Sequence, residues 1–140
     1  MQVMPYTGQR LAQRLKLPGF TAQQLLEPEW GIRMGSYYLK LLSDQFSRSI
    51  PLIAAAYNGG PHRVHQWLYY FGYLEMDEFV EHIPFSETRN YVKKVSANFA
   101  IYNSLYGLNS NKDLQLLGPV GLVASSEPPP LKEVWTDDNF

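Results

Sequence analysis

Cysteine is absent from this 140-residue sequence, so the chain can form neither a disulfide bond nor a thiolate metal site. An excess of one charge is also absent, because 12 basic and 13 acidic residues leave a net charge of −1. This balance gives no electrostatic support for binding nucleic acid or an anionic membrane. No apolar run approaches the length of a membrane-spanning helix, and no export signal follows Met1. Taken alone, these absences favour a cytoplasmic protein.

Apolar residues are plentiful, at 45% of the chain, and aromatic residues make up 14%. This content is enough for a hydrophobic core and argues against disorder. The apolar positions recur at helical spacing, and no segment shows the alternation of a strand. Length and periodicity predict one all-α domain over residues 1–106. After Gly107 the periodicity ends, and three consecutive prolines at 128–130 indicate an extended tail over residues 107–140.

Prolines, glycines and capping residues predict where the helices begin and end. Helices are expected from the MQVMP segment to Leu15, over 29–46, from Ser49 or Ile50 to Asn58, over 61–71, from an Asp77 cap to His82, and from a Ser86 cap onward. The buried stripe expected along the second helix is Trp30, Met34, Tyr37, Tyr38, Leu41, Leu42 and Phe46. The stripe expected along the last helix is Tyr91 or Val92, Val95, Phe99, Tyr102 and Tyr106.

A sharp bend joins two of these helices at YNGGP, residues 57–61, inside the stretch LIAAAYNGGPHRVHQW. Asn and Gly tolerate the positive φ that ends a helix, and Pro61 suits the first turn of the next one. The bend alone is explained as a helix corner. His62 and His65 have no third ligand nearby, so we expect surface histidines and no metal site. Arg89 is expected to form a surface ion pair.

The bend and two other segments resemble soluble lytic murein transglycosylases, the goose-lysozyme-like enzymes that cut peptidoglycan. AAAYNGGPHRVHQWL is similar to that family's Ala-Tyr-Asn motif, MQVMPYTGQRLA to its Gly-Leu-Met-Gln segment, and FVEHIPFSETRNYVKKV to its Ile-Pro-Phe…Glu-Thr…Tyr-Val block. The helical segment LLEPEWGIRMGSYYL separates the two motifs that come first in the chain. The resemblance covers Met1 to Tyr106 and implies a lysozyme-like, all-α fold.

The resemblance implies a lytic transglycosylase that cleaves the bond between N-acetylmuramic acid and N-acetylglucosamine. In that family one Glu acts first as acid and then as base. The 6-hydroxyl of the muramic acid is the nucleophile, so the product is a 1,6-anhydro sugar, and neither metal nor cofactor takes part. The implied partner is the peptidoglycan glycan strand. The parent protein is expected to be a monomer in the periplasm or cell envelope.

The family's catalytic Glu belongs to a Glu-Ser motif upstream of the Met-Gln segment, which here is Met1-Gln2. We therefore expect this Glu and its helix to precede Met1, with no catalytic residue in the chain and a domain incomplete at its N-terminus. A truncated reading frame, a short glycan-binding relative, or replacement by Glu87 would each account for this. The rival functions are a non-catalytic glycan-binding module, a muramidase-like or chitinase-like hydrolase on the same fold, and a protein–protein adaptor.

The resemblance also assigns the substrate-binding residues Gln2, Met4, Tyr57, Asn58, Glu87 and Tyr91. An amide and a thioether, from the first two, suit the acetamido groups of the glycan, although core packing also explains Met4. Asn58, on the cleft floor with Tyr57, is expected to hold sugar or orient the general acid, and a helix cap is its structural alternative. Glu87 matches a carboxylate that binds muropeptide, and a charge at a helix start is its alternative. The hydroxyl of Tyr91 is expected to reach the active site.

Overall fold

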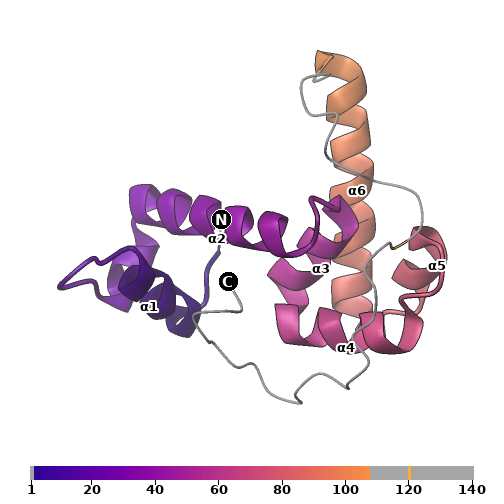
Figure 1. Ribbon diagram of the computed structural model, residues 1–140. Helices are drawn as coiled ribbons and strands as arrows, with labels where there is room; N and C mark the ends of the chain where they lie inside the picture. Colours follow the sequence, from indigo (N-terminus) through magenta and orange to yellow (C-terminus); the bar gives the residue numbers. More distant parts are fainter. Residues whose placement is uncertain (1, 108–119, 121–140) are drawn as a thin grey trace. The chain divides into compact units, whose positions relative to one another are not determined.

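The computed structural model describes residues 2–107 and 120, and in this part every element longer than a single residue is a helix (Figure 1). The predicted all-α architecture is therefore confirmed. The chain divides into two compact units, residues 1–41 and 42–140. Apart from Gly107 and Val120, the predicted tail lies outside the described residues. None of the described helices combines the length and the apolarity needed to cross a membrane.

The first unit contains α1 (Pro5–Arg14), the 3-10 helix η1 (Ala22–Leu26) and the beginning of α2 (Pro28–Gln45). Pro5 begins α1 because the first turn needs no N–H from that residue. Leu11 and Ala12 form the buried side of this helix. η1 packs on α1 beside Gly8, where an added Cβ would lie 2.7 Å from Cδ1 of Leu25. The missing side chain at Gly8 therefore permits this close approach.

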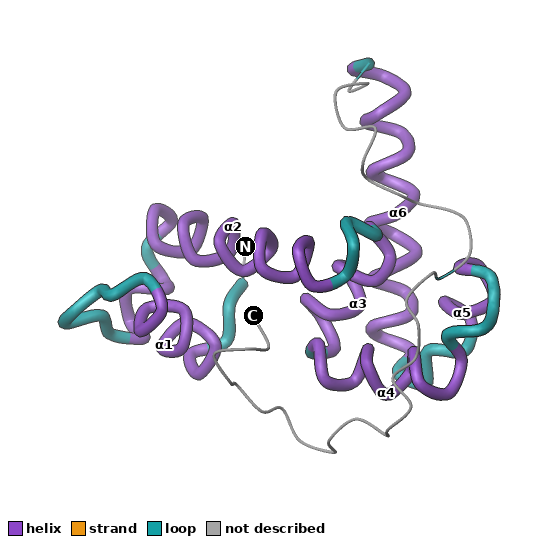
Figure 2. The backbone as a smooth tube through the Cα atoms, viewed as in Figure 1, coloured by secondary structure: helices purple, strands orange, loops and turns teal. Residues whose placement is uncertain are grey.

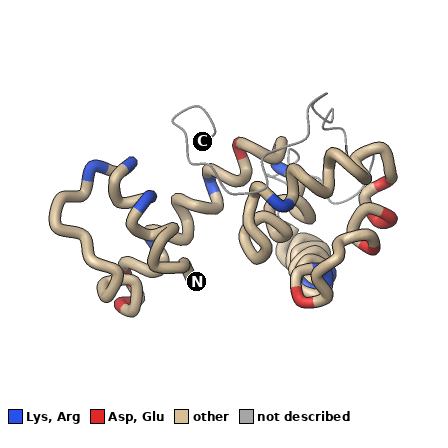
Figure 3. The backbone as a smooth tube through the Cα atoms, turned by 90° about the horizontal axis from the view of Figure 1, so that it is seen from below, with Lys and Arg blue, Asp and Glu red and all other residues tan. Residues whose placement is uncertain are grey.

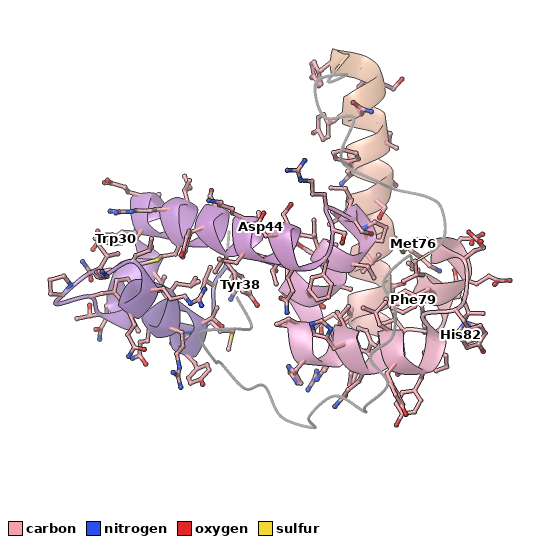
Figure 4. The ribbon with its side chains drawn as sticks, in the orientation of Figure 1. Trp30, Tyr38, Asp44, Met76, Phe79 and His82 are labelled. Atoms are coloured by element: carbon pink, nitrogen blue, oxygen red, sulfur yellow. The ribbon has the colours of Figure 1, made fainter. Side chains whose placement is uncertain are left out.

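The second unit contains the end of α2, then α3 (Ile50–Gly59), α4 (Pro61–Phe71), α5 (Met76–Glu81) and α6 (Ser86–Tyr106). α3 packs against both α4 and α6 (Figure 2). Residues 51–56 of α3 are all buried, and the small Ala residues among them allow neighbouring helices to come close. α5 contacts α6, and its Met76 and Phe79 are buried (Figure 4). α3 is thus the central helix of this unit.

The buried stripe predicted along α2 is confirmed at Met34, Tyr38, Leu42 and Phe46. These residues recur every four positions, so they share one side of the helix. The other predicted members of the stripe are half-buried. Helical periodicity was therefore a sufficient guide to the buried side of α2.

Two predicted helix caps are wrong by one or two residues. α5 begins at Met76, so Asp77 lies in its first turn, where its carboxylate accepts the N–H of Glu78 at 3.0 Å. α6 begins at Ser86, and the residue in the capping position is Phe85. In both cases the polar residue lies inside the first turn, where its side-chain oxygen can accept a hydrogen bond from the backbone N–H groups that have no partner within the helix.

The buried stripe predicted along α6 is wrong at its far end. Val92 is buried, but Tyr102 and Tyr106 are 55% and 67% exposed. The two tyrosine rings stack on each other, with centroids 5.8 Å apart. Figure 1 shows the last turns of α6 extending beyond the other helices of its unit. Periodicity identified the apolar side of α6, but burial also requires a neighbouring element.

Candidate functional site

The corner between α3 and α4 is closed by two glycines with different constraints. Gly60 follows α3 with φ of 95°, a conformation that strains any residue with a side chain. At Gly59 an added Cβ would lie 3.2 Å from Cγ2 of Thr88 and 3.2 Å from the ring of Trp67. Pro61 then begins α4 directly. The chain therefore turns in very few residues and brings the end of α3 against the first turns of α6.

A hydrogen bond ties this corner to α6. The hydroxyl of Thr88 donates to Oδ1 of Asn58 at 2.7 Å. Thr88 is only 4% exposed, whereas Asn58 is exposed. The bond uses the amide oxygen, so the amide NH₂ of Asn58 can offer its two donors at the surface. Asn58 lies inside the last turn of α3, whose C-cap is Gly60, so the alternative that it caps the helix is wrong. Its part in holding sugar or orienting the general acid stays a prediction.

Sequence reasoning did not single out Thr88. The residue lies in the Glu-Thr part of the third motif, next to the predicted site residue Glu87. A threonine in the first turn of a helix is usually exposed, and nothing local distinguishes a buried one. Only the packing of α6 on α3 makes it a partner of Asn58.

Two phenols lie beside the corner, on α3 and α6. Burial raises the pKa of Tyr57 above its usual value of 10.0, and interaction with Tyr91 raises this pKa further. The hydroxyl of Tyr57 therefore remains protonated near neutral pH and can donate as well as accept hydrogen bonds. Glu87 precedes Tyr91 by four residues, so the two share one side of α6. The structure thus places Tyr57 and Asn58 near the end of α3, and Glu87 and Tyr91 in the first turns of α6, which packs on α3. We call these four residues the corner residues.

An aromatic pair supports the start of α6. The rings of Trp67 and Phe85 lie 5.8 Å apart, and the guanidinium of Arg63 lies 4.6 Å from the Phe85 ring. The guanidinium of Arg89, which was expected to form a surface ion pair, donates to the backbone carbonyl of Ile83 at 2.8 Å. Arg89 therefore holds the turn between α5 and α6 in place.

The histidines of α4 are not the simple surface residues that were expected. His65 is half-buried, its Nε2 lies 2.9 Å from Nε2 of Gln45, and its ring lies 5.1 Å from that of Phe46. Burial lowers the pKa of His65 below 6.5, and interaction with His62 lowers it further. Within the described residues, no three His, Asp or Glu side chains cluster in a way that could hold a metal ion.

The other two predicted site residues, Gln2 and Met4, belong to the first unit. Both are exposed, and Met4 is the residue that precedes α1. Met4 is 66% exposed, so the alternative that it is a core residue is wrong. Their part in a site with the corner residues stays a prediction from the resemblance.

The family described as Transglycosylase SLT domain matches residues 1–80, more than half of the chain. The chain belongs to this family. A second family, described as Soluble lytic transglycosylase helical domain, matches residues 82–111. The predicted resemblance is thereby confirmed.

Curated relatives and a crystal structure agree with this family. The chain is 43% identical over 109 residues to the soluble lytic murein transglycosylase of Escherichia coli (strain K12), covering 76% of the chain and 17% of that protein. It is 40% identical over 114 residues to a putative soluble lytic murein transglycosylase of Haemophilus influenzae, covering 81% of the chain and 18% of the relative. The crystal structure of the 70 kDa soluble lytic transglycosylase from E. coli matches with a TM-score of 0.70 and 42% identity, over 76% of this chain and 18% of that one.

These matches confirm the lysozyme-like helical fold. The chain spans less than a fifth of the length of these relatives, which are 17% and 18% covered.

Proposed function

We propose that residues 1–106 form a lytic transglycosylase domain whose corner residues bind the glycan strands of peptidoglycan. The reaction is cleavage of the bond between N-acetylmuramic acid and N-acetylglucosamine with formation of 1,6-anhydro-N-acetylmuramic acid. The names of the relatives, which describe murein transglycosylases, support this substrate. The observation that carries the proposal is the Thr88–Asn58 hydrogen bond, because it joins the Ala-Tyr-Asn motif to the motif that contains Glu87 and Tyr91.

The chemistry of the corner residues suits a polyhydroxylated, N-acetylated ligand. The amide NH₂ of Asn58 can donate to an acetamido carbonyl or a sugar hydroxyl, and the phenols of Tyr57 and Tyr91 can donate or accept. The exposed carboxylate of Glu87 can accept hydrogen bonds from hydroxyls or from amides of a peptide stem. The resemblance also assigns to glycan binding the amide of Gln2 and the thioether of Met4, both in the first unit. A ligand of this kind needs directed hydrogen bonds more than it needs net charge.

The corner residues act in binding rather than in proton transfer. Cleavage of a glycosidic bond requires a proton for the leaving oxygen, which a carboxylic acid usually supplies. Among the corner residues Glu87 is the one carboxylate, and the family pattern gives it to muropeptide binding. We therefore assign no catalytic residue to Gln2, Met4 or the corner. The same corner would serve a non-catalytic glycan-binding module, so the products must distinguish the two functions.

Sedimentation with purified sacculi tests the binding site. The chain should pellet with sacculi, and Asn58→Ala and Glu87→Gln should each weaken this binding by about fivefold, the loss of one or two hydrogen bonds. Glu78→Gln, an exposed residue of α5, is the matched control and should bind like the parent chain. Equal binding by all variants would contradict the assignment of the corner.

Mass spectrometry of any soluble product tests the reaction class. Products ending in 1,6-anhydro-N-acetylmuramic acid are expected of a lytic transglycosylase. Reducing ends would indicate a muramidase-like or chitinase-like hydrolase, and binding without product would indicate a non-catalytic module. We also propose that the parent protein works as a monomer in the bacterial periplasm or cell envelope, where peptidoglycan is found.

A further inference from the structure

An open pocket of about 600 Å³ lies at the C-terminal end of α1, within the first unit. The residues that line it include Gln9, Gln13, Lys16 and Phe20. None of the residues assigned to the glycan site lines it. The pocket therefore belongs to neither the corner residues nor the Gln2–Met4 segment.

Lys16 occupies a backbone position at which glycine is usual. The N–H of Leu17 bonds to the carbonyl of Ala12 at 3.0 Å, and the N–H of Lys16 bonds to that of Gln13 at 3.1 Å. This pair of bonds marks a common helix ending in which one residue adopts the left-handed backbone conformation. Here that residue is Lys16, with φ of 53°. A side chain is disfavoured there, and such strain is typically kept at functional positions.

Phe20, the aromatic residue of the lining, packs against a residue that does not line the pocket. The ring of Phe20 lies 5.6 Å from that of Trp30, near the beginning of α2 (Figure 4), and the Arg33 guanidinium lies 5.5 Å from the Trp30 ring. The position of Phe20 therefore depends on an ordered neighbour. Gln9 and Gln13 are one turn apart on α1, so their amides lie on the same side of the helix.

We propose that this pocket is a second saccharide site, which binds an N-acetylated amino sugar. The Phe20 ring suits the apolar face of a sugar, the two amides suit its acetamido and hydroxyl groups, and Lys16 adds a donor. The lining contains no acidic residue. The charged residues of α1 and of the segment just after it are all basic, namely Arg10, Arg14 and Lys16 (Figure 3 draws Lys and Arg in blue).

The helix end offsets part of the basic charge around this pocket, and the glutamines of the lining suit a neutral sugar. The offset arises because the C-terminal end of a helix carries partial negative charge. The choice of an amino sugar rests on the proposed function, since peptidoglycan strands consist of such units.

The test is a ¹H–¹⁵N NMR titration of the full chain with the trisaccharide of N-acetylglucosamine. Backbone signals of Gln13, Gly19 and Phe20 should shift and saturate.

Phe20→Leu keeps an apolar contact with Trp30 but removes the ring, and should weaken this binding by about fivefold. Lys16→Gly should weaken it by about threefold while leaving the melting temperature equal or higher, because glycine relieves the left-handed strain. Lys40→Met, in the same unit, is the control for lost charge and should bind normally.

The outcomes separate this site from the corner. Shifts confined to Asn58 and Tyr91 would overturn the second site and leave the proposed function intact. Pocket shifts without corner shifts would support the second site and count against the corner. Lys16→Gly that lowers the melting temperature and leaves the affinity unchanged would show that Lys16 only stabilises the helix end, and would overturn its role in binding.

Discussion

The two ends of α6 carry similar side chains in different surroundings. Near its start Thr88 and Val92 are 4% and 1% exposed, and this part of the unit holds the corner residues. Near its end Ile101 and Leu105 are 54% and 69% exposed. α6 contacts α3 and α5, so the difference lies in the neighbouring helices rather than in the helix itself. Hence we infer that contact with α3 is what orders the candidate site.

The largest contrast should appear between two identical substitutions. Leu52→Ala, in the fully buried part of α3, should lower the free energy of unfolding by about 3 kcal/mol through lost contacts and a cavity. Leu105→Ala, at the exposed end of α6, should change it by less than about 0.5 kcal/mol. Urea denaturation of both variants gives the two values. Similar losses would mean that the end of α6 is packed as tightly as α3.

A smaller effect is expected from the hydrogen bond at the start of α6. Thr88→Val keeps the shape but removes the donor to Asn58, and should lower the free energy of unfolding by about 1 kcal/mol. Ser104→Ala, at the exposed end of the same helix, should have almost no effect. Denaturation curves measure both. If Thr88→Val is as stable as the parent chain, the Thr88–Asn58 bond adds no stability.

The smallest expected effect is a pH dependence of stability that comes from His65 of α4. The pKa of His65 is lowered in the folded state, so the unfolded chain, titrating near 6.5, binds the proton more readily. The contribution of His65 to the free energy of unfolding is fully present above pH 6.5 and is lost as the pH falls below this value. His65→Gln should therefore reduce the fall in melting temperature between about pH 7.5 and about pH 5.5, the range in which histidine titrates. The exposed His82→Gln is the control and should keep that fall.

Local sequence signals were sufficient for the helices and the corner. Pro61 and the glycine pair predicted the turn after Asn58 because backbone conformation is a local property. The Thr88–Asn58 bond joins residues 30 positions apart, so it depends on how α6 packs on α3. The exposure of Tyr102 was missed for the same reason, because periodicity identifies an apolar side without identifying the element that covers it.

The most direct measurement is a double-mutant cycle in glycan binding. It compares the affinity for soluble peptidoglycan fragments of the parent chain, Thr88→Val, Asn58→Ala and the double variant. If Thr88 orients the Asn58 amide, Thr88→Val should weaken binding by about threefold to tenfold in the parent chain and not at all when Asn58 is already alanine. Fold-changes that simply multiply would contradict the coupling of the two motifs at this site.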